Sequence, residues 1–448
     1  MRLVTSRCTR RFLYVTAILL HRCDRKKDTG LVRNVGDSNG VDSFDSQRSN
    51  EVLASTLPDH NQPSSVDKQD SPKEPPRVTF SQSGGLRDRL AQLDCSVAIT
   101  SYQSGFLYGL GRDATGGLHL HQSAMPKPMG LAYQGDGRLT LAGGAQIVQF
   151  ANVLSPHERM NDMFDACFVP RRVHLTGRLD AHDVGIDTDG APIFVNTRFN
   201  CLARPCERHA FQEVWRPPFI SDLVDEDRCH LNGMAMRDGA PAFVTAVSRS
   251  NTIDGWRDRR DGGGVVINVQ RNAVICEGLS MPHSPRWYNG QLWVLNSGTG
   301  ELGVVERPDP DSGMGRFVPK VFCPGFLRGL SFHKGYAFVG LSKPRYKRFE
   351  GLPLDQKLRN ADSEPWCGLQ IIDLATLTCV DWFRIDGAVS GLYDVAVLPG
   401  IKTPMTLGPD APEAAKLITW DKVHSSDAAA AEPSTPHATP PNAEHLRV

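Results

Sequence analysis

His182-Asp-Val-Gly185, His230-Leu-Asn-Gly233 and His283-Ser-Pro-Arg286 are three copies of one short pattern. In each copy a histidine stands three residues before the start of a half-apolar, strand-like run. Each run is broken by a turn that contains a glycine: Gly190, Gly239 or Gly290. Alternating runs on both sides of a glycine turn are typical of a β-hairpin. The stretch therefore predicts a repeated hairpin.

The hairpin pattern recurs on both sides of this stretch. An earlier copy begins at Gly130, and later copies begin at Gly329 and at Gly391, where the last copy is cut short. With positions 130, 185, 233, 286, 329 and 391 taken as equivalent, the spacings are 55, 48, 53, 43 and 62 residues. Four-stranded propeller blades repeat at roughly 40–50 residues. We predict an all-β fold, a six-bladed β-propeller whose N-terminal strands pair with the last C-terminal strand to close the ring.

Composition sets the limits of this domain. Residues 28–90 are rich in Asp, Ser, Asn, Gln and Pro, and the end of the chain is rich in Ala, Pro and Ser, so neither buries enough apolar surface to fold. We expect a disordered or processed extension over 1–90, a propeller domain over 95–402 and a disordered tail over 403–448. Inside the domain, residues 153–172 fit no hairpin and are expected to form a short helix or a loop.

Charge and cysteine content restrict the partners and the compartment. Lysine plus arginine number 50 and aspartate plus glutamate number 50, so no net field draws nucleic acid or anionic lipid. The 11 cysteines are scattered and odd in number, which favours reduced, buried thiols. The apolar run 12–20 is too short to span a bilayer and lacks a small-residue cleavage site. We expect a cytoplasmic monomer that binds no nucleic acid, has no membrane span, and takes a small-molecule, glycan or protein ligand.

Several long motifs carry a resemblance to a known family. They include His-Asp-Val-Gly-Ile-Asp (182–187), Glu-Asp-Arg-Cys-His-Leu-Asn-Gly-Met-Ala (226–235), Ser-Met-Pro-His-Ser-Pro-Arg (280–286) and Pro-Gly-Phe-Leu-Arg-Gly-Leu (324–330). Over about residues 95–401 the chain resembles a bacterial family of uncharacterised conserved hypothetical proteins, which has a domain of unknown function and propeller-like repeats. The resemblance implies the propeller fold and brings no established activity with it.

The three histidines give the main functional hypothesis. If the repeats are blades, His182, His230 and His283 stand at equivalent places near the starts of inner strands, where their imidazoles converge at the channel mouth. Three histidines are enough for a catalytic metal site with an open position. Asp183 or Asp394 is expected to act as a fourth metal ligand or to orient one. The cofactor hypothesis is one divalent metal ion, Zn²⁺, Mn²⁺ or Fe²⁺. The alternatives are histidines that only hydrogen-bond within their blades, and catalysis without a metal.

Strand alternation restricts this hypothesis. If the histidines lay within the regular strands, they would share a face with Ile186, Met234 and Trp287, which are all apolar. The histidines therefore have to lie just before the regular strands for their rings to converge.

Basic residues near the same mouth predict an anionic substrate. They are Arg198, Arg286, Arg328, Lys343 and Arg345. The arginine fork binds carboxylate, sulfate or phosphate. We assign Arg286, Arg328 and Asp394 as catalytic residues. The predicted function is metal-assisted lyase, hydrolase or oxidative chemistry on a small anionic or glycan substrate. The alternative is a non-catalytic propeller that binds a protein or a glycan.

Overall fold

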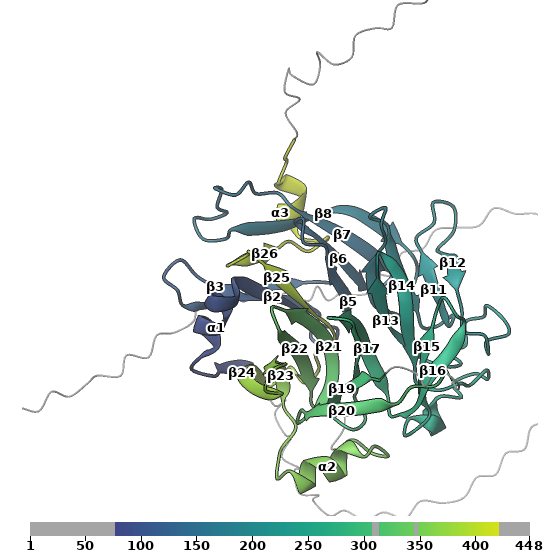
Figure 1. Ribbon diagram of the computed structural model, residues 1–448. Helices are drawn as coiled ribbons and strands as arrows, with labels where there is room; N and C mark the ends of the chain where they lie inside the picture. The colour runs from purple at the N-terminus through teal and green to yellow at the C-terminus, as the bar shows by residue number, and fades with distance from the viewer. Residues whose placement is uncertain (1–76, 307–312, 345–347, 421–448) are drawn as a thin grey trace, which may run out of the picture. The chain divides into compact units, whose positions relative to one another are not determined.

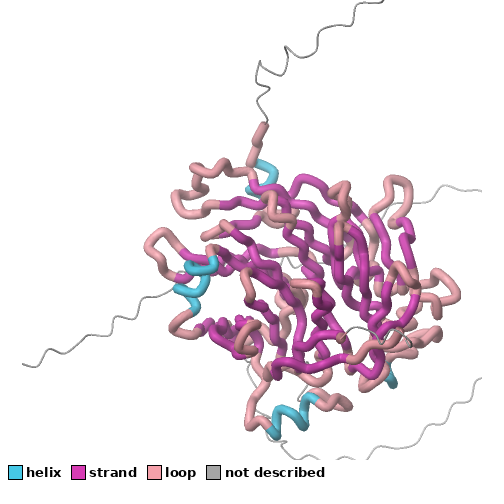
Figure 2. The backbone as a smooth tube through the Cα atoms, viewed as in Figure 1, coloured by secondary structure: helices cyan, strands magenta, loops and turns pink. Residues whose placement is uncertain are grey.

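The strands of this protein form six sheets around one axis, as the computed structural model shows for residues 77–306, 313–344 and 348–420 (Figures 1 and 2). Within these residues, each sheet contains four or five strands, and neighbouring strands within a blade run antiparallel apart from one added parallel strand. The inner strands contact one another in the order β5, β9, β13, β17, β21 and β25, and β25 contacts β5 again. The fold is the six-bladed β-propeller that the sequence predicts.

Five blades take their strands consecutively along the chain, from the axis outward. The first contains β5 (Pro128–Tyr133), β6 (Arg138–Gly143), β7 (Gln146–Asn152) and β8 (Ala166–Leu175). The second contains β9 (Ala181–Ile186), β10 (Pro192–Asn196), β11 (Cys201–Arg204) and β12 (Gln212–Trp215). The third contains β13 (Leu231–Arg237), β14 (Ala240–Ala246), β15 (Gly264–Asn268) and β16 (Ala273–Leu279).

The next two blades follow the same order. The fourth contains β17 (Pro282–Tyr288), β18 (Gln291–Asn296), β19 (Glu301–Val305) and β20 (Phe317–Phe322). The fifth contains β21 (Phe326–His333), β22 (Tyr336–Ser342), β23 (Cys367–Asp373) and β24 (Thr378–Asp386). The turns of the inner hairpins in the second, third and fourth blades need glycine, since Gly190, Gly239 and Gly290 have φ of 78°, 74° and 75°, a region that other residues enter only with strain.

The sixth blade is built from both ends of the domain. Its inner strand β25 (Val395–Pro399) pairs antiparallel with β2 (Cys95–Ser101), with Val395 opposite Ile99 and Pro399 opposite Cys95. The outer strands of this blade are β3 (Phe106–Arg112) and β4 (Leu118–Ala124). The truncated last repeat of the sequence therefore contributes one strand to a blade whose other strands come from the N-terminal side.

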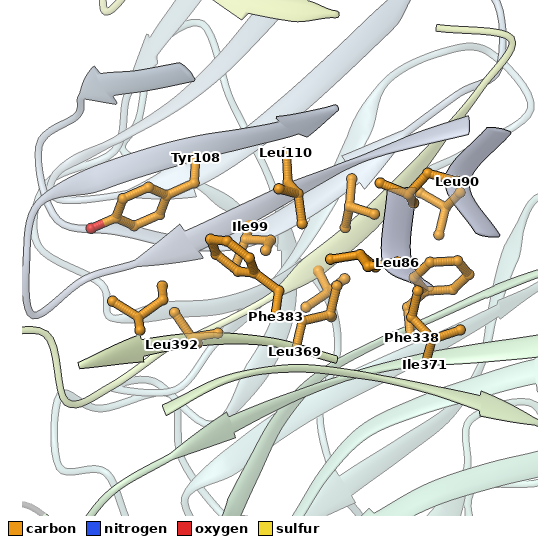
Figure 3. Close-up of a cluster of buried hydrophobic side chains, with 14 of the residues drawn as sticks. Leu86, Leu90, Ile99, Tyr108, Leu110, Phe338, Leu369, Ile371, Phe383 and Leu392 are labelled. Atoms are coloured by element: carbon orange, nitrogen blue, oxygen red, sulfur yellow. The ribbon is translucent and has the colours of Figure 1, made fainter. Parts of the chain in front are cut away.

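Part of the predicted N-terminal extension belongs to the fold. Strand β1 (Thr79–Gln82) pairs with β24, and helix α1 (Leu86–Leu93) follows it. Leu86 and Leu90 are fully buried in the core between the fifth and sixth blades (Figure 3). The prediction that 1–90 lies outside the domain is wrong for residues 77–90, because a few well-spaced leucines and an open strand edge outweigh the polar composition. Residues 1–76 lie outside the described part of the chain.

The predicted disordered tail also contains structure. Strand β26 (Pro404–Thr406) runs parallel to β8, and helix α3 (Pro412–Lys416) follows. The side chain of Asp165 accepts the N–H groups of Lys402 and Thr403, and Leu407 is buried. The prediction is therefore wrong for residues 403–420, since tertiary hydrogen bonds hold a segment whose composition alone would leave it unfolded. Residues 421–448 lie outside the described part.

The remaining segments connect blades. Of residues 153–172, expected as a helix or a loop, 166–172 belong to β8 and the rest is a loop with one isolated β-bridge. The 3₁₀ helix η1 (Arg257–Arg259) and helix α2 (Leu354–Asn360) lie in other connections. All nine cysteines in the described ranges are free, and seven of them are buried. No helix in these ranges has the length and apolar character needed to cross a membrane.

Candidate functional site

Bulges near the axis decide which residues of the inner strands face the channel. The first residues of five inner strands pair with the ends of the second strands: Pro128 with Gly143, Ala181 with Asn196, Leu231 with Ala246, Pro282 with Asn296 and Phe326 with Ser342. The register of each pair shifts within the next four residues. Such bulges leave inner-strand residues free of the regular ladder and re-aim their side chains.

Two of the three predicted histidines are equivalent and the third is not. His182 and His283 each follow the first residue of their strand, and Asn232 holds that place in the blade between them. His230 comes two residues earlier, directly before β13. The prediction of three equivalent histidines is therefore wrong for His230. All three nevertheless precede the regular part of the strand, as strand alternation requires.

Two of the three imidazoles are in contact, and the third is close enough for both to influence its pKa. The ring centroids of His182 and His230 are 4.9 Å apart and nearly perpendicular. The ring of Tyr393 lies 5.6 Å from that of His182. Nδ2 of Asn232 is 3.0 Å from Nε2 of His283. We call this set the histidine mouth: His182, His230, Asn232, His283, Arg328 and Tyr393.

Each imidazole of the histidine mouth is held through Nδ1. Nδ1 of His182 is 2.7 Å from the carbonyl oxygen of Asp180, and Nδ1 of His283 is 2.7 Å from that of Met281. Nδ1 of His230 is 2.9 Å from Oδ2 of Asp227. Because these oxygens only accept, we place a proton on Nδ1 of each ring, which leaves Nε2 as the other ring nitrogen that can accept. Nε2 of His283 accepts from Asn232, whereas Nε2 of the other two rings has no hydrogen bond to the described residues.

Left-handed backbone just before the inner strands makes these contacts. Lys127, Asp180, His230 and Met281 precede four successive inner strands and have φ between 47° and 50°. Residues other than glycine adopt this region at a cost of order 1–3 kcal/mol. At Asp180 and Met281 the turn points the carbonyl oxygen at the imidazole two residues further along. Local strain in the connection therefore orients the rings.

Burial keeps two of the histidines neutral. His182 is 8% exposed and His283 is 3% exposed. Burial, followed by the nearby His230, holds the pKa of His182 well below its usual range. Burial, followed by the positive charge of Arg328, does the same to the pKa of His283. At neutral pH both rings are uncharged, so the histidine mouth offers imidazole lone pairs and not imidazolium charge.

Asp227 and Trp256 fix the third histidine. Nε1 of Trp256 donates to Oδ2 of Asp227 over 3.0 Å, and the indole stacks on the imidazole of His230 at 4.1 Å. The carboxylate thus holds the ring orientation and stabilises the imidazolium that forms when Nε2 takes a proton. Sequence reasoning missed both residues. The signal in the sequence that could have identified Asp227 is its position three residues before His230.

Arg328 and Tyr393 add a cation and a hydroxyl group to the histidine mouth. The guanidinium carbon of Arg328 lies 4.8 Å from the ring centroid of Tyr393 and 5.5 Å from that of Phe326. Arg328 is only 8% exposed, so its charge is weakly screened. The hydroxyl of Tyr393 is buried without a hydrogen-bond partner in the described structure, and burial raises the pKa of this phenol. The hydroxyl therefore keeps its proton and remains a donor. Nothing in the sequence marks Tyr393.

Three further predicted site residues bind one another. Nη1 of Arg286 is 2.8 Å from Oδ2 of Asp183, and Nη2 is 3.3 Å from Oδ1 of Asp183. Nη2 also lies 3.4 Å from Oδ1 of Asp394. We call Asp183, Arg286 and Asp394 the axis cluster. Its hydrogen bonds to main-chain groups reach Leu131 on β5, Met234 on β13 and Leu330 on β21.

The axis cluster connects all six inner strands. Asp183 lies on β9, Arg286 on β17, and Asp394 directly before β25, so the side chains and their main-chain partners include every blade. Each carboxylate oxygen of Asp183 accepts one main-chain N–H and one guanidinium N–H. We therefore assign Arg286 and Asp394 to the core of the axis, in place of the catalytic role given to them by sequence, and do not assign Asp183 as a metal ligand.

The axis cluster holds one more negative charge than positive. Burial, opposed by Arg286 and reinforced by Asp183, raises the pKa of Asp394 to about 7. Burial lowers the pKa of Arg286, but the two carboxylates more than offset it, so that its pKa is raised overall. Asp183 is the closer partner of the guanidinium, which leaves Asp394 as the carboxylate that takes up a proton.

The predicted metal site is not formed as proposed. The described residues contain no group of three His, Cys, Asp or Glu placed to hold a metal ion. His182 and His230 each present a basic Nε2, whereas Nε2 of His283 is occupied by Asn232 and Asp183 is occupied by Arg286. The residues present thus fit two imidazole ligands but not a three-histidine set with Asp183.

The other predicted cations do not join the histidine mouth. Arg198 forms an ion pair with Asp225, and both side chains are more than 40% exposed. Lys343 is 3.1 Å from Asp386. Arg345 lies outside the described residues. Of the predicted cations in the described part, Arg328 is the one placed beside the histidines.

A cavity of about 530 Å³ lies at the opposite end of the inner strands. Its lining residues come at or after the level of the axis cluster on their strands, whereas the histidine mouth comes before it. We call it the funnel; its larger side chains are Tyr133, Met236, Trp287, Tyr288 and Phe332. Arg286 also lines it, so the axis cluster stands between the funnel and the histidine mouth.

Comparison with known proteins gives the family but not the activity. The model of a domain of unknown function (DUF4915) matches residues 85–407, and the chain belongs to that family. No curated protein matches the chain. A nidogen/laminin complex is 11% identical over 68% of this chain and 99% of that chain, with a TM-score of 0.41. Virginiamycin B lyase from Staphylococcus aureus is 10% identical over 69% and 99%, with a TM-score of 0.34. The calcium-binding protein regucalcin from Agrobacterium tumefaciens str. C58 is 13% identical over 65% and 80%, with a TM-score of 0.36. Similarities at this level carry no argument about function.

Proposed function

We propose that the histidine mouth of this DUF4915 protein is the active site of a lyase or hydrolase that acts on a small anionic substrate by acid–base chemistry. The observation that carries the proposal is the fixed state of the imidazoles: oxygen acceptors hold Nδ1 of all three rings, and Nε2 of His182 and His230 remains basic and without a protein partner in the described structure. A general base needs such a fixed, unprotonated nitrogen.

His230 is the residue best suited to act as the base. Its Nδ1–H is directed at Asp227, and the indole N–H of Trp256 holds that carboxylate in place. This is the arrangement in which a carboxylate orients a histidine and stabilises its protonated form. Neutral His182, 4.9 Å away between ring centroids, accepts a hydrogen bond from the substrate or relays the proton.

Arg328 and Tyr393 supply the complementary functions. The guanidinium of Arg328, buried between two aromatic rings, attracts a carboxylate or a sugar-acid group of the substrate. The ring of Tyr393 lies 5.6 Å from the imidazole of His182, and its protonated hydroxyl serves as the general acid for a leaving or enolic oxygen. An acid, a base and an anion-binding group then surround one point.

A metal-assisted reaction is the second candidate, and one observation favours it. Imidazoles that bind metals almost always donate their other N–H to a carboxylate or a carbonyl oxygen, as His182 and His230 do here. In that case Nε2 of these two residues would hold a Zn²⁺, Mn²⁺ or Fe²⁺ ion, which would polarise the substrate or a water molecule. Elemental analysis of protein purified without an affinity tag separates the two candidates.

The test is turnover of a panel of small carboxylates, uronates and sugar phosphates in D₂O. Nuclear magnetic resonance follows deuterium uptake at carbon, which reports proton abstraction, and the appearance of unsaturated or hydrolysed products. We expect His230→Gln to reduce turnover at least about 100-fold with an unchanged melting temperature. The matched control, His157→Gln, removes an exposed histidine and is expected to change neither.

Two outcomes contradict the proposal. If panel compounds raise the melting temperature but are never converted, the protein is a binding propeller, which is the alternative predicted from sequence. If a compound is converted and His230→Gln converts it as fast as the wild type, the base lies elsewhere.

A further inference from the structure

Asp183 and Asp394 occupy the same place on two blades, and each directly follows a residue of the histidine mouth. One oxygen of Asp183 accepts the N–H of Val184 and the other accepts the N–H of Met234 from the next blade, both over 2.9 Å. Asp394 repeats this pattern with Val395 and with Leu131 of its own next blade, again over 2.9 Å. The preceding residues, His182 and Tyr393, are therefore equivalent as well.

We propose that Arg286 is a positioning residue for the histidine mouth: by holding Asp183 and Asp394 together it sets the distance between His182 and Tyr393. Arg286 reaches across the axis from β17, so it is the one side chain in the described structure that bridges these two carboxylates. The inference rests on the proposed function only for its kinetic test, because the distance between the rings is measurable without a substrate.

Close backbone packing transmits the position of the carboxylates to the residues before them. A Cβ atom on Gly130 would lie 2.7 Å from Cα of Asp183, and one on Gly329 would lie 2.7 Å from Cα of Asp394. Neighbouring inner strands thus touch the main chain of both aspartates directly, which leaves no space for either to move alone. A shift of Asp183 or Asp394 therefore shifts His182 or Tyr393, whose rings are 5.6 Å apart.

Arg286 donates hydrogen bonds from all three nitrogens of its guanidinium group. Nε donates to the carbonyl oxygen of Leu330 over 3.1 Å, Nη1 to Asp183 and to main-chain oxygens, and Nη2 to both carboxylates. A lysine ammonium is a point charge that reaches only part of this set. Arg286→Lys consequently keeps the charge of the axis cluster and removes its bridging geometry.

The experiment compares Arg286→Lys with Arg89→Lys. Arg89 forms a partly buried ion pair with Asp381, 3.2 Å away, that ties α1 to β24 outside the histidine mouth, so it controls for the general loss of a bridging arginine. In protein with isotope-labelled histidine we expect Arg286→Lys to lose the nuclear Overhauser contact between His182 and Tyr393. Arg89→Lys is expected to keep this contact as in the wild type.

Kinetics on any panel compound that the wild type converts give the second readout. We expect Arg286→Lys to lower kcat about 100-fold and to change KM by less than about threefold, since a displacement of about 1 Å far from the chemistry has this size of effect. If Arg286→Lys does not fold, Asp394→Asn, which retains the Arg286–Asp183 contact, replaces it, with a weakened ring contact as the expected result.

The outcomes distinguish this inference from the proposed function. If Arg286→Lys keeps the ring contact of the wild type, or if Arg89→Lys loses it equally, Arg286 has no positioning role. If the wild type converts no panel compound, the proposed function fails, and the ring contact still decides the role of Arg286.

Discussion

The two ends of the inner strands are built from different residues. The starts carry His182, His230, His283, Arg328 and Tyr393, and the connections that precede the strands hold the imidazoles of the three histidines. The ends form the funnel, whose wall includes several aromatic side chains, such as those of Tyr288 and Phe332, which stack 4.6 Å apart. The same strands thus carry the polar groups of the histidine mouth on one side of the axis cluster and the aromatic side chains of the funnel on the other.

This difference follows from how the strands are connected. Before each inner strand the chain arrives through a connection of irregular length, in which left-handed residues such as Asp180 and Met281 aim a carbonyl oxygen at an imidazole. After the strand it turns at once through a tight glycine hairpin, as at Gly239. Irregular connections have the freedom to arrange polar side chains, whereas tight hairpins do not.

Removing the guanidinium between the two ends has the largest expected effect. Arg286→Met leaves the buried carboxylates of Asp183 and Asp394 without their cation, which costs about 3–5 kcal/mol of unfolding free energy. The triple variant Arg286→Met/Asp183→Asn/Asp394→Asn removes the unpaired charges and is expected to recover most of this loss. Urea denaturation measures both. A cost below about 1 kcal/mol for Arg286→Met alone would contradict the central role of the axis cluster.

The pH dependence of stability tests the same cluster. Because the pKa of Asp394 is raised to about 7, the folded state binds a proton that the unfolded state has released, and this stabilisation is complete below about pH 4 and lost as the pH rises through about 7. The shift corresponds to on the order of 4 kcal/mol. His182 and His283 act in the opposite sense, since burial lowers their pKa. The difference between wild type and Asp394→Asn, measured by urea denaturation from pH 4 to 8, therefore isolates Asp394; a difference that stays constant with pH would show that Asp394 does not titrate.

A pair of glycines compares main-chain packing with side-chain packing along the inner strands. A Cβ on Gly130 would meet main-chain atoms of Asp183 and Val184 at 2.7–3.0 Å, at the level of the axis cluster. A Cβ on Gly185 would meet side-chain atoms of Met236 at 2.6–2.7 Å, on the side of the funnel. We expect Gly130→Ala to cost about 1–3 kcal/mol and Gly185→Ala to cost less than about 1 kcal/mol, because a thioether rearranges and a main chain does not. Equal shifts of the urea midpoint would argue against this distinction.

A substitution in the funnel has the smallest expected effect. Met236→Leu conserves volume and is expected to cost less than about 1.5 kcal/mol. It should leave the turnover at the histidine mouth unchanged, since the axis cluster stands between Met236 and the imidazoles. Melting temperature and turnover are measured on the same sample. A loss of turnover without a loss of stability would show that the two ends communicate.

The repeat was readable in the sequence because its signals are local. Glycines at 190, 239 and 290 mark hairpin turns, and the alternation on either side of them marks the strands, so the number of blades follows from counting. The equivalence of positions across the blades did not follow. The hydrogen bonds of the two aspartates show that Asp183, not Gly185, matches Asp394. These bonds run between neighbouring blades, so the alternating pattern within one strand does not record them.

The candidate site was predicted only in part for a related reason. His182, His230, His283 and Arg328 were found because they stand in long motifs near the inner strands. Asp227, Trp256 and Tyr393 were missed, and Arg286 was assigned to catalysis although it binds Asp183, 103 residues away in the chain, and Asp394, 108 residues away. Such partners meet only when the blades are assembled.

The sequence by itself determined the all-β class, the repeated hairpin, the six blades and the set of histidines, since each depends on residues close together in the chain. Only the tertiary structure decided that 77–93 and 403–407 join the fold, that His230 stands out of register with the other two histidines, and that one arginine connects six strands at the axis. The physical reason is that hydrogen bonds within a hairpin are local, whereas the charges, bulges and backbone contacts at a propeller axis come from every blade at once.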